Sequence, residues 1–422
     1  MKDKVENTAT AKLFTRDFNL VVVGQIISIL GSAVLRFALN LYVLDITGRA
    51  DIFGLLIAVS AIPAILFTPL GGAIADRFNR RDLMVIFDFS SSTTVLVFLL
   101  LLGTGYAPVA VIAVFLVILS MISSMYQPAV QASVPVLISD KNLASGNGIV
   151  MGVSALSGLL GPVLGGALYG IVGLNVLVAA SCIAFFLSAV MEIFIRMPFK
   201  KPERSKGMIP TILDDMKLGL RYVVREKPTI LKVIILAAAL NMFMSPLFIV
   251  GVPYILRIAL GSSEGMYGIG MGVLELSSII GALLTGALTK NLKLSGLHRL
   301  LLAVSFLIVP IAFSVTPAML GFGYWPPFML MMIFSALVTA TATLLSIFVI
   351  TIVQKATPNE ILGKVMGIIM AASGCAAPLG MAMYGFAFEL FSNTVYVPIL
   401  AACIFTAGIS LSTKLYLKKS EI

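Results

Sequence analysis

Long apolar runs alternate with short polar segments along almost the whole chain. A helix that crosses the hydrocarbon core of a bilayer needs about 20 apolar residues, and most of these runs approach or exceed that length. The pattern predicts an all-α protein with twelve membrane-spanning helices in two groups of six, at residues 18–44, 53–75, 83–102, 109–129, 143–172, 176–195, 233–256, 267–288, 300–315, 327–352, 365–388 and 396–417.

The composition agrees with a multi-pass membrane protein. Hydrophobic residues make up 59% of the chain and charged residues 11%, and the mean hydropathy is +1.07. In soluble domains about a quarter of all residues are charged, so an ordinary soluble protein is excluded. The N-terminus is polar and the first apolar run is too long for a signal peptide, so we expect no cleavable signal. The three cysteines lie inside apolar runs without paired spacing, which favours packing over disulfides or metal binding.

Residues 196–228 interrupt the apolar pattern with a dense group of lysines and arginines. Within this segment, residues 209–224 place apolar side chains at helical spacing opposite charged ones, which predicts an amphipathic helix along the membrane surface. The segment therefore predicts a cytoplasmic linker between one six-helix bundle at residues 1–195 and a second at residues 229–422.

The distribution of positive charge predicts the orientation. With the N-terminus inside, the predicted cytoplasmic segments hold 26 of the 29 lysines and arginines. This asymmetry places both termini in the cytoplasm. The net charge of +10 then reflects orientation with anionic membrane lipid as the partner, and no nucleic-acid partner is expected.

The two groups of helices also echo each other in sequence. Gly72 is followed after 214 residues by Gly286, and Pro162 after 216 residues by Pro378. A nearly constant offset predicts a duplicated six-helix unit, with two bundles related by an axis along the membrane normal.

The hairpin between the second and third runs has the order Gly-x-x-x-Asp-Arg-x-x-Arg-Arg, at Gly72, Asp76, Arg77, Arg80 and Arg81. This order resembles the loop between helices two and three in the major facilitator superfamily. The resemblance implies a conformational switch. The glycine would let a neighbouring helix approach, the aspartate would face a positive helix N-terminus, and the arginines would bind phosphates or carboxylates. An ordinary basic loop is the alternative.

The fifth run carries a second motif, in which small residues and a proline recur at fixed spacing. It resembles the antiporter signature of drug-exporting members of the superfamily, with serine in place of one glycine at Ser157. Small residues allow close helix packing and the proline kinks the helix, so a tight seal against ion leakage is implied. A merely close-packed helix is the alternative. The motif residues are Gly148, Gly161, Pro162, Gly165 and Gly166.

The fourth run contains no charge between residues 109 and 126 and ends in Tyr126-Gln127-Pro128-Ala129. This pattern resembles the macrolide-efflux branch of the drug/proton antiporters. The resemblance implies a monomeric secondary exporter in the cell membrane of a prokaryotic-type cell. It would move macrolide-like amphiphilic drugs against protons by alternating access, confer antibiotic resistance and need no cofactor. The alternative is an exporter or flippase of a specific metabolite, siderophore or lipid.

Ionisable residues inside the runs need an explanation, because each costs about 2.5–3.5 kcal/mol on insertion scales. Glu275 is our candidate for the acid that binds the coupled proton, with a structural hydrogen bond as the alternative. Asp88 and Arg36 are further proton-coupling candidates. For Asp88, a role in bracing the hairpin at residues 77–81 is favoured. Arg36 is expected to pair with an acid, to offset a substrate carboxylate or to snorkel outward.

Polar residues in the first and seventh runs are candidates for hydrogen bonds to the substrate, at Gln25, Asn40 and Asn241. Phe37 and Met242 could supply adaptable apolar walls, although lipid contact also explains such residues. The chain has one histidine, no predicted metal site and no phosphate-binding Gly-x4-Gly-Lys-[Ser/Thr] loop. An enzyme and an ATP-driven pump are therefore excluded as classes.

Overall fold

The computed structural model describes residues 14–105, 108–139, 142–198, 217–288 and 296–417, and these contain helices and no strand. The α-helices are α1 (Arg16–Thr47), α2 (Ala50–Arg77), α3 (Arg80–Gly103), α4 (Val109–Leu137), α5 (Leu143–Ile193), α7 (Pro228–Phe243), α8 (Val252–Tyr254), α9 (Glu264–Leu288), α10 (Leu297–Ser314), α11 (Pro317–Leu320), α12 (Trp325–Ala356), α13 (Asn359–Leu390) and α14 (Tyr396–Leu417). Short π- or 3₁₀-helical elements are η2 (Tyr222–Glu226), η3 (Leu247–Gly251), η4 (Ile255–Ala259) and η6 (Ser392–Thr394).

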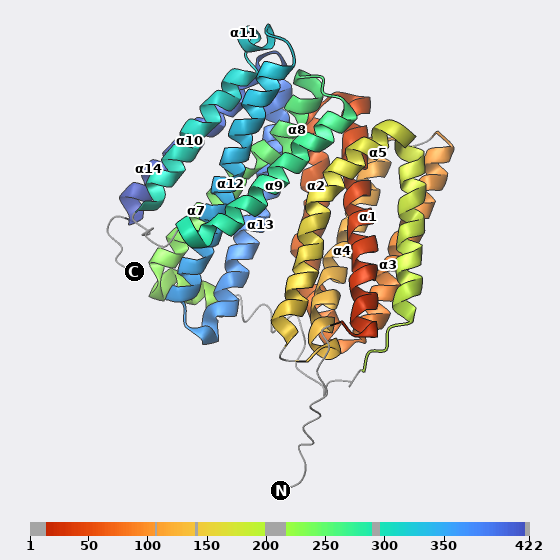
Figure 1. Cartoon of the computed structure of the whole chain (residues 1–422). Helices are drawn as coiled ribbons and strands as arrows, with labels where there is room; N and C mark the ends of the chain where they lie inside the picture. Colours follow the sequence, from red (N-terminus) through yellow and green to blue (C-terminus); the bar gives the residue numbers. More distant parts are fainter. Residues whose placement is uncertain (1–13, 106–107, 140–141, 199–216, 289–295, 418–422) are drawn as a thin grey trace. The chain divides into compact units, whose positions relative to one another are not determined.

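In the part of the chain described, eleven helical stretches are long and apolar enough to cross a membrane. One of them, α5, contains two of the predicted spans, which meet at Gly173 with φ 75° and ψ 174°. A positive φ is accessible to glycine without steric cost, so the helix can break there and continue in a new direction (Figure 1). The seventh predicted span is assembled from α7, η3, α8 and η4. The prediction of an all-α protein with twelve spans is confirmed.

Local sequence explains where several helices begin and end. Asn79 caps α3, because its Oδ1 accepts a hydrogen bond from the Arg81 amide at 3.1 Å. Gly48, with φ 62°, makes the turn between α1 and α2. Of the predicted amphipathic helix, residues 209–216 lie outside the described residues. The remainder is helical and leads into η2.

The contacts divide the chain into two compact units. Unit 1 comprises residues 1–36, 66–161 and 172–205, and unit 2 comprises residues 37–65, 162–171 and 206–422. Unit 2 therefore contains not only α7–α14 but also segments of α1, α2 and α5. The predicted bundle boundaries at residues 195 and 229 stay a prediction.

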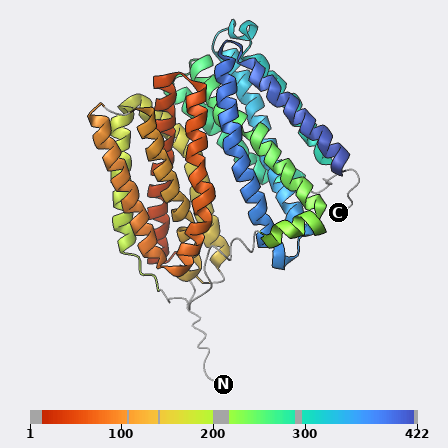
Figure 2. The ribbon, with the colours of Figure 1, turned by 180° about the vertical axis from the view of Figure 1, so that it is seen from behind.

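Each unit has an apolar core of its own. In unit 1, α3 packs along α4, and a buried cluster includes Phe18, Met84 and Tyr126. In unit 2, α10 runs beside both α12 and α14, α9 beside α12, and α7 beside α13 (Figures 1 and 2). Because lipid-facing side chains stay exposed in such bundles, many large apolar residues lie on the surface of each unit.

Candidate functional site

The hairpin motif lies where α2 ends at Arg77 and α3 begins at Arg80. Arg77 is exposed, whereas Arg80 and Arg81 are half-buried. Arg81 Nε lies 3.0 Å from Asp82 Oδ1. The side chain of Asp76 lies outside the described part of the structure, so its contact with a helix N-terminus stays a prediction.

The close helix approach expected at Gly72 occurs instead at its neighbour, Gly71. A Cβ atom on Gly71 would lie 2.7 Å from Met125 Cα of α4, which is closer than real side chains come. A Cβ on Gly72 would meet nothing within 4 Å. The two residues are about 100° apart around the helix, so only one of them can face α4. The prediction for Gly72 is wrong in this respect.

The motif in α5 contacts different helices along its length. A Cβ on Gly161 would lie 2.7 Å from Cβ of Ala33 in α1, within unit 1. In unit 2, a Cβ on Gly166 would lie 2.5 Å from the Glu264 carbonyl oxygen, and one on Gly268 would lie 2.5 Å from that of Pro162. The backbones of α5 and α9 are therefore in direct contact at Gly166 and Gly268.

The two other glycines of this motif differ from each other. Gly165 is buried, whereas Gly148 is exposed, and a Cβ there would meet nothing within 4 Å. Close packing along α5 is thus concentrated at the C-terminal part of the motif. The ion seal implied by the resemblance stays a prediction.

Asp88 belongs to a buried polar group inside unit 1. Its Oδ1 accepts a hydrogen bond from Ser28 Oγ of α1 at 2.7 Å, and the residue is 2% exposed. Nearby, Tyr126 Oη of α4 donates to Oε1 of the fully buried Glu192 in α5 at 2.8 Å. Asp88 therefore links α3 to α1, and its expected contact with the hairpin stays a prediction.

Arg36 and Gln25 are also polar residues of α1 within unit 1. The Arg36 guanidinium donates to Ser123 Oγ at 2.6 Å and to Ser32 Oγ at 3.2 Å. Its described partners are thus hydroxyl groups, not a carboxylate. Gln25 is fully buried, and its Nε2 donates to the Val150 carbonyl at 3.2 Å, which holds α1 against α5.

Unit 2 contains a partly open, mainly apolar cavity of about 370 Å³ between α7, α10, α12 and α13. Asn241 lies in its wall and donates from Nδ2 to the Ala237 carbonyl at 2.9 Å. None of the lining residues is charged. The other polar residues in the wall carry hydroxyl groups: Ser245, Thr343, Ser346 and Ser373. A space of this size and chemistry suits an uncharged, mainly apolar group.

The other three cavity candidates lie elsewhere in unit 2. Phe37 is buried and packs on Tyr267, with ring centroids 5.0 Å apart. Asn40 is half-buried in α1. Met242 is half-buried and its carbonyl oxygen faces Gly380 of α13, whereas its neighbour Asn241 lines the cavity. Roles for Phe37, Asn40 and Met242 in binding stay predictions.

Glu275 is exposed in α9, and the described residues provide it with no hydrogen-bond partner. It lies seven residues after Gly268, which is about two turns, so both residues occupy the same face of the helix. That face contacts α5 at Gly268. Glu275 therefore lies about 10 Å further along α9 from Gly268.

Charged side chains gather around Arg257 of η4 in unit 2. Its Nε and Nη2 donate to Asp45 of α1 at 2.5 and 3.0 Å, and Nη2 donates to Glu264 at 2.7 Å. Tyr169 of α5 donates to Asp45 at 3.3 Å. We name these four residues the Arg257 cluster. It ties the end of α1, and α5 just before its break at Gly173, to α9. Its cation lies in a π-helix, an element often found at functional sites.

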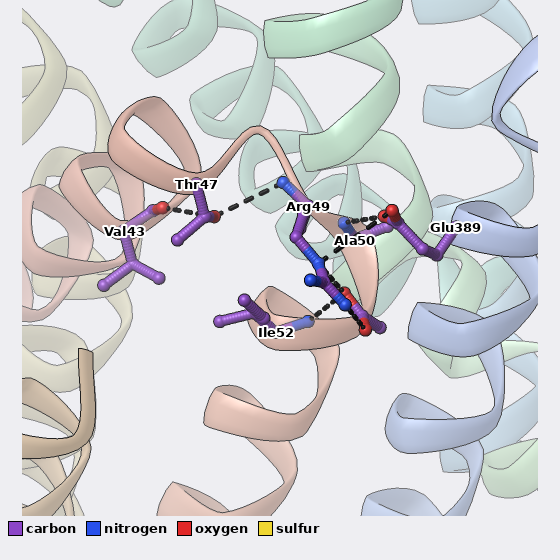
Figure 3. A network of polar contacts seen from close by, with 7 residues as sticks. Val43, Thr47, Arg49, Ala50, Ile52 and Glu389 are labelled. Carbon is purple, nitrogen blue, oxygen red and sulfur yellow. Dashed lines mark hydrogen bonds and ion pairs between the residues drawn. The ribbon is translucent and has the colours of Figure 1, made fainter.

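A second charged group joins α2 to α13 (Figure 3). Arg49 binds Asp51 through two hydrogen bonds, at 3.0 and 2.6 Å, and lies 3.9 Å from Glu389. Glu389 accepts a hydrogen bond from the Ala50 amide at the start of α2, at 3.0 Å. A carboxylate at a helix N-terminus is stabilised by the exposed amides there. Below this group, Gly54 and Gly385 let α2 and α13 touch.

Several of these residues escaped the sequence analysis. Asp45 and Glu389 lie near helix ends, where solvation is the simplest expectation, but the structure gives both of them protein partners. Glu192 lies in the last turns of a span, and no motif marks it. The cost of burying an acid within a span is the signal that could have identified it.

Comparison with known proteins gives consistent results. The family model described as Major Facilitator Superfamily matches residues 21–381. Macrolide efflux protein A of Streptococcus pyogenes is 23% identical over 369 residues, covering 86% of this chain and 87% of that protein. The enterobactin exporter EntS of Citrobacter koseri is 24% identical over 375 residues, covering 87% and 84%.

The fold is also found among solved structures. The crystal structure of nucleoside transporter NupG superposes with a TM-score of 0.70 at 11% identity, covering 96% of this chain and 100% of that one. At this identity, the likeness concerns the fold alone.

Proposed function

We propose that this chain, which belongs to the Major Facilitator Superfamily, exports a bulky amphiphilic compound of the macrolide kind in exchange for protons. The chain is a multi-pass transporter of the cell membrane, not an enzyme, and similarity to efflux and exporter proteins supports export as the direction. The finer claims, namely the substrate class and the coupled proton, are our proposal.

The observation that carries the substrate class is the cavity beside Asn241 in unit 2. Its volume of about 370 Å³ is near the lower end of the range of about 300–1,000 Å³ for ligand pockets. It would therefore hold the apolar part of a larger amphiphile while the remainder extends beyond it. Asn241 Oδ1 and the hydroxyl groups of the wall would provide hydrogen bonds without a charged partner.

A siderophore is the second candidate, because the enterobactin exporter covers a similar share of the chain at similar identity. Siderophores carry acidic, metal-binding oxygen atoms, and a cation in the wall would favour them. The lining residues of the cavity include none. The cavity chemistry therefore favours the apolar part of an amphiphile over an acidic siderophore.

The test is to fill the cavity. We expect Ser346→Phe to lower erythromycin efflux from cells and erythromycin binding to the purified protein by about tenfold, since the new ring occupies the site. Ser412→Phe, at an exposed position of α14, is the matched control and should retain both. Unchanged erythromycin binding by Ser346→Phe would refute this site, and enterobactin transport without erythromycin transport would favour the siderophore.

A further inference from the structure

Two acidic side chains of unit 1 lie completely inside the protein. Asp88 is 2% exposed and Glu192 is 0% exposed. Ser28 donates to one oxygen of Asp88 and Tyr126 donates to one oxygen of Glu192. The other two oxygens, Asp88 Oδ2 and Glu192 Oε2, are buried and have no hydrogen-bond partner among the described residues.

A third acceptor without a donor lies on the adjoining helix. Oε1 of Gln25 is buried and unpartnered, although the amide nitrogen of that side chain donates to Val150. The next residue toward the N-terminus, Gly24, lies beside Glu192, because a Cβ there would be in ordinary contact with Glu192 Cγ and Oε1 at 3.4 Å. Buried acceptors are nearly always satisfied in native proteins, so this group is short of donors.

The surrounding helices supply neutral groups to the two acids. α1 presents Gln25 and Ser28, α4 presents Tyr126, and α5 presents Ser188, whose hydroxyl donates to the Gly24 carbonyl. Cations on these helices lie away from the two acids along the chain: Arg16 begins α1, Arg80 and Arg81 begin α3 two turns before Asp88, and Arg36 lies eight residues beyond Ser28, about 12 Å along α1. Arg36 is bound to Ser32 and Ser123. None of the described ion pairs involves Asp88 or Glu192.

Two like charges placed together in a dry interior cannot both persist, and one of them takes up a proton. Glu192 lies beside Gly24 of α1, and Asp88 is bonded to Ser28, which is one turn further along the same helix. A carboxylate that accepts a proton from hydronium becomes a carboxylic acid with an O–H donor, and the hydronium becomes water. The new donor would satisfy one of the three orphan oxygens.

We propose that Asp88 and Glu192 together form the proton-binding site of this transporter, with Tyr126 as the residue that positions Glu192. The inference rests on the proposed proton antiport and locates its proton in unit 1. A proton is held while the site is dry and is released when the helices of unit 1 admit water.

The test uses the purified full chain and needs no transported substrate. We expect an infrared C=O band of a protonated carboxylic acid at neutral pH, which shifts in D₂O. The band should disappear or weaken in Glu192→Gln and Asp88→Asn and persist in Glu275→Gln, which removes the competing proton-site candidate on α9. Absence of the band from the native protein, or an equal band in both unit 1 variants, would overturn the proposal.

Two further measurements complete the test. If the acid variants fail to fold, Tyr126→Phe keeps both acids and removes one donor, so the band should titrate at a different pH. An unchanged titration would contradict the role of Tyr126. Loss of the band on adding sodium chloride would show a metal-cation site and overturn the proton assignment.

Coupling is measured separately in proteoliposomes. Glu192→Gln should lose pH-driven erythromycin accumulation by about tenfold or more while erythromycin self-exchange stays near the native rate. Native pH dependence in this variant would refute the coupling role. A band without any erythromycin transport would refute the proposed substrate and leave the proton site supported.

Discussion

The contact between α5 and α9 yields the most specific prediction. Alanine at Gly268 would place a Cβ 2.5 Å from the Pro162 carbonyl oxygen, whereas real Cβ contacts are essentially never under 3.0 Å. One backbone must therefore withdraw by at least about 0.5 Å. Overpacking of this kind costs about 1–3 kcal/mol. Gly268→Ala should thus disfavour the arrangement in which α5 and α9 touch.

The size of the effect follows from this cost. An overpacking cost of about 1–3 kcal/mol changes the equilibrium constant between the arrangement in which α5 and α9 touch and one in which they are apart by about 5–150-fold. The measurement is the distance distribution between spin labels at Leu168 of α5 and Ile269 of α9, both exposed, in a chain without its native cysteines. We expect the short-distance population to fall in Gly268→Ala.

The control for this prediction lies in the same helix. A Cβ on Gly265 would meet nothing within 4 Å, so Gly265→Ala should leave the distance distribution unchanged. If Gly268→Ala also leaves the distribution unchanged, or if both variants change it equally, the backbone contact does not hold the two helices together.

The remaining predictions concern charge and packing. Arg257→Gln leaves two carboxylates without their cation, and because hydrogen bonds to charged groups contribute about 1.5–3 kcal/mol, thermal unfolding should begin at a lower temperature. Arg49→Gln removes a more exposed cation and should have a smaller effect, so the reverse order would contradict the assigned roles. Gly71→Ala crowds Met125 and should lower the melting temperature, whereas Gly72→Ala points into open space and should be neutral or stabilising. Equal melting temperatures for these two variants would show that α2 does not approach α4 through Gly71.

Much of the fold could be predicted from sequence, because the membrane imposes a simple rule on composition. An apolar run of sufficient length has to be a helix, since every backbone group in the bilayer needs a partner. The break at Gly173 falls in the gap between the predicted spans at residues 143–172 and 176–195. The superfamily resemblance carried by the hairpin is confirmed by the family match, whereas the antiporter role implied by the motif in α5 stays a prediction.

The site was harder to predict, because its contacts join residues far apart in the chain. Asp45 and Arg257 are 212 residues apart, and no local pattern indicates that they meet. Gly71 and Gly72 are adjacent and chemically identical, so only tertiary packing decides which of them faces α4. Glu192 carries no motif, and its partner Tyr126 is visible in sequence only as part of a family pattern.

The exchange of drug for proton is the central claim, and proton flux tests it most directly. Purified protein is reconstituted in liposomes that contain a pH-sensitive dye, a pH gradient is imposed and erythromycin is added. We predict proton movement that depends on both erythromycin and native protein and that is lost in Glu192→Gln, with Glu275→Gln measured alongside to test the acid in α9. Erythromycin transport without any proton movement would contradict the account.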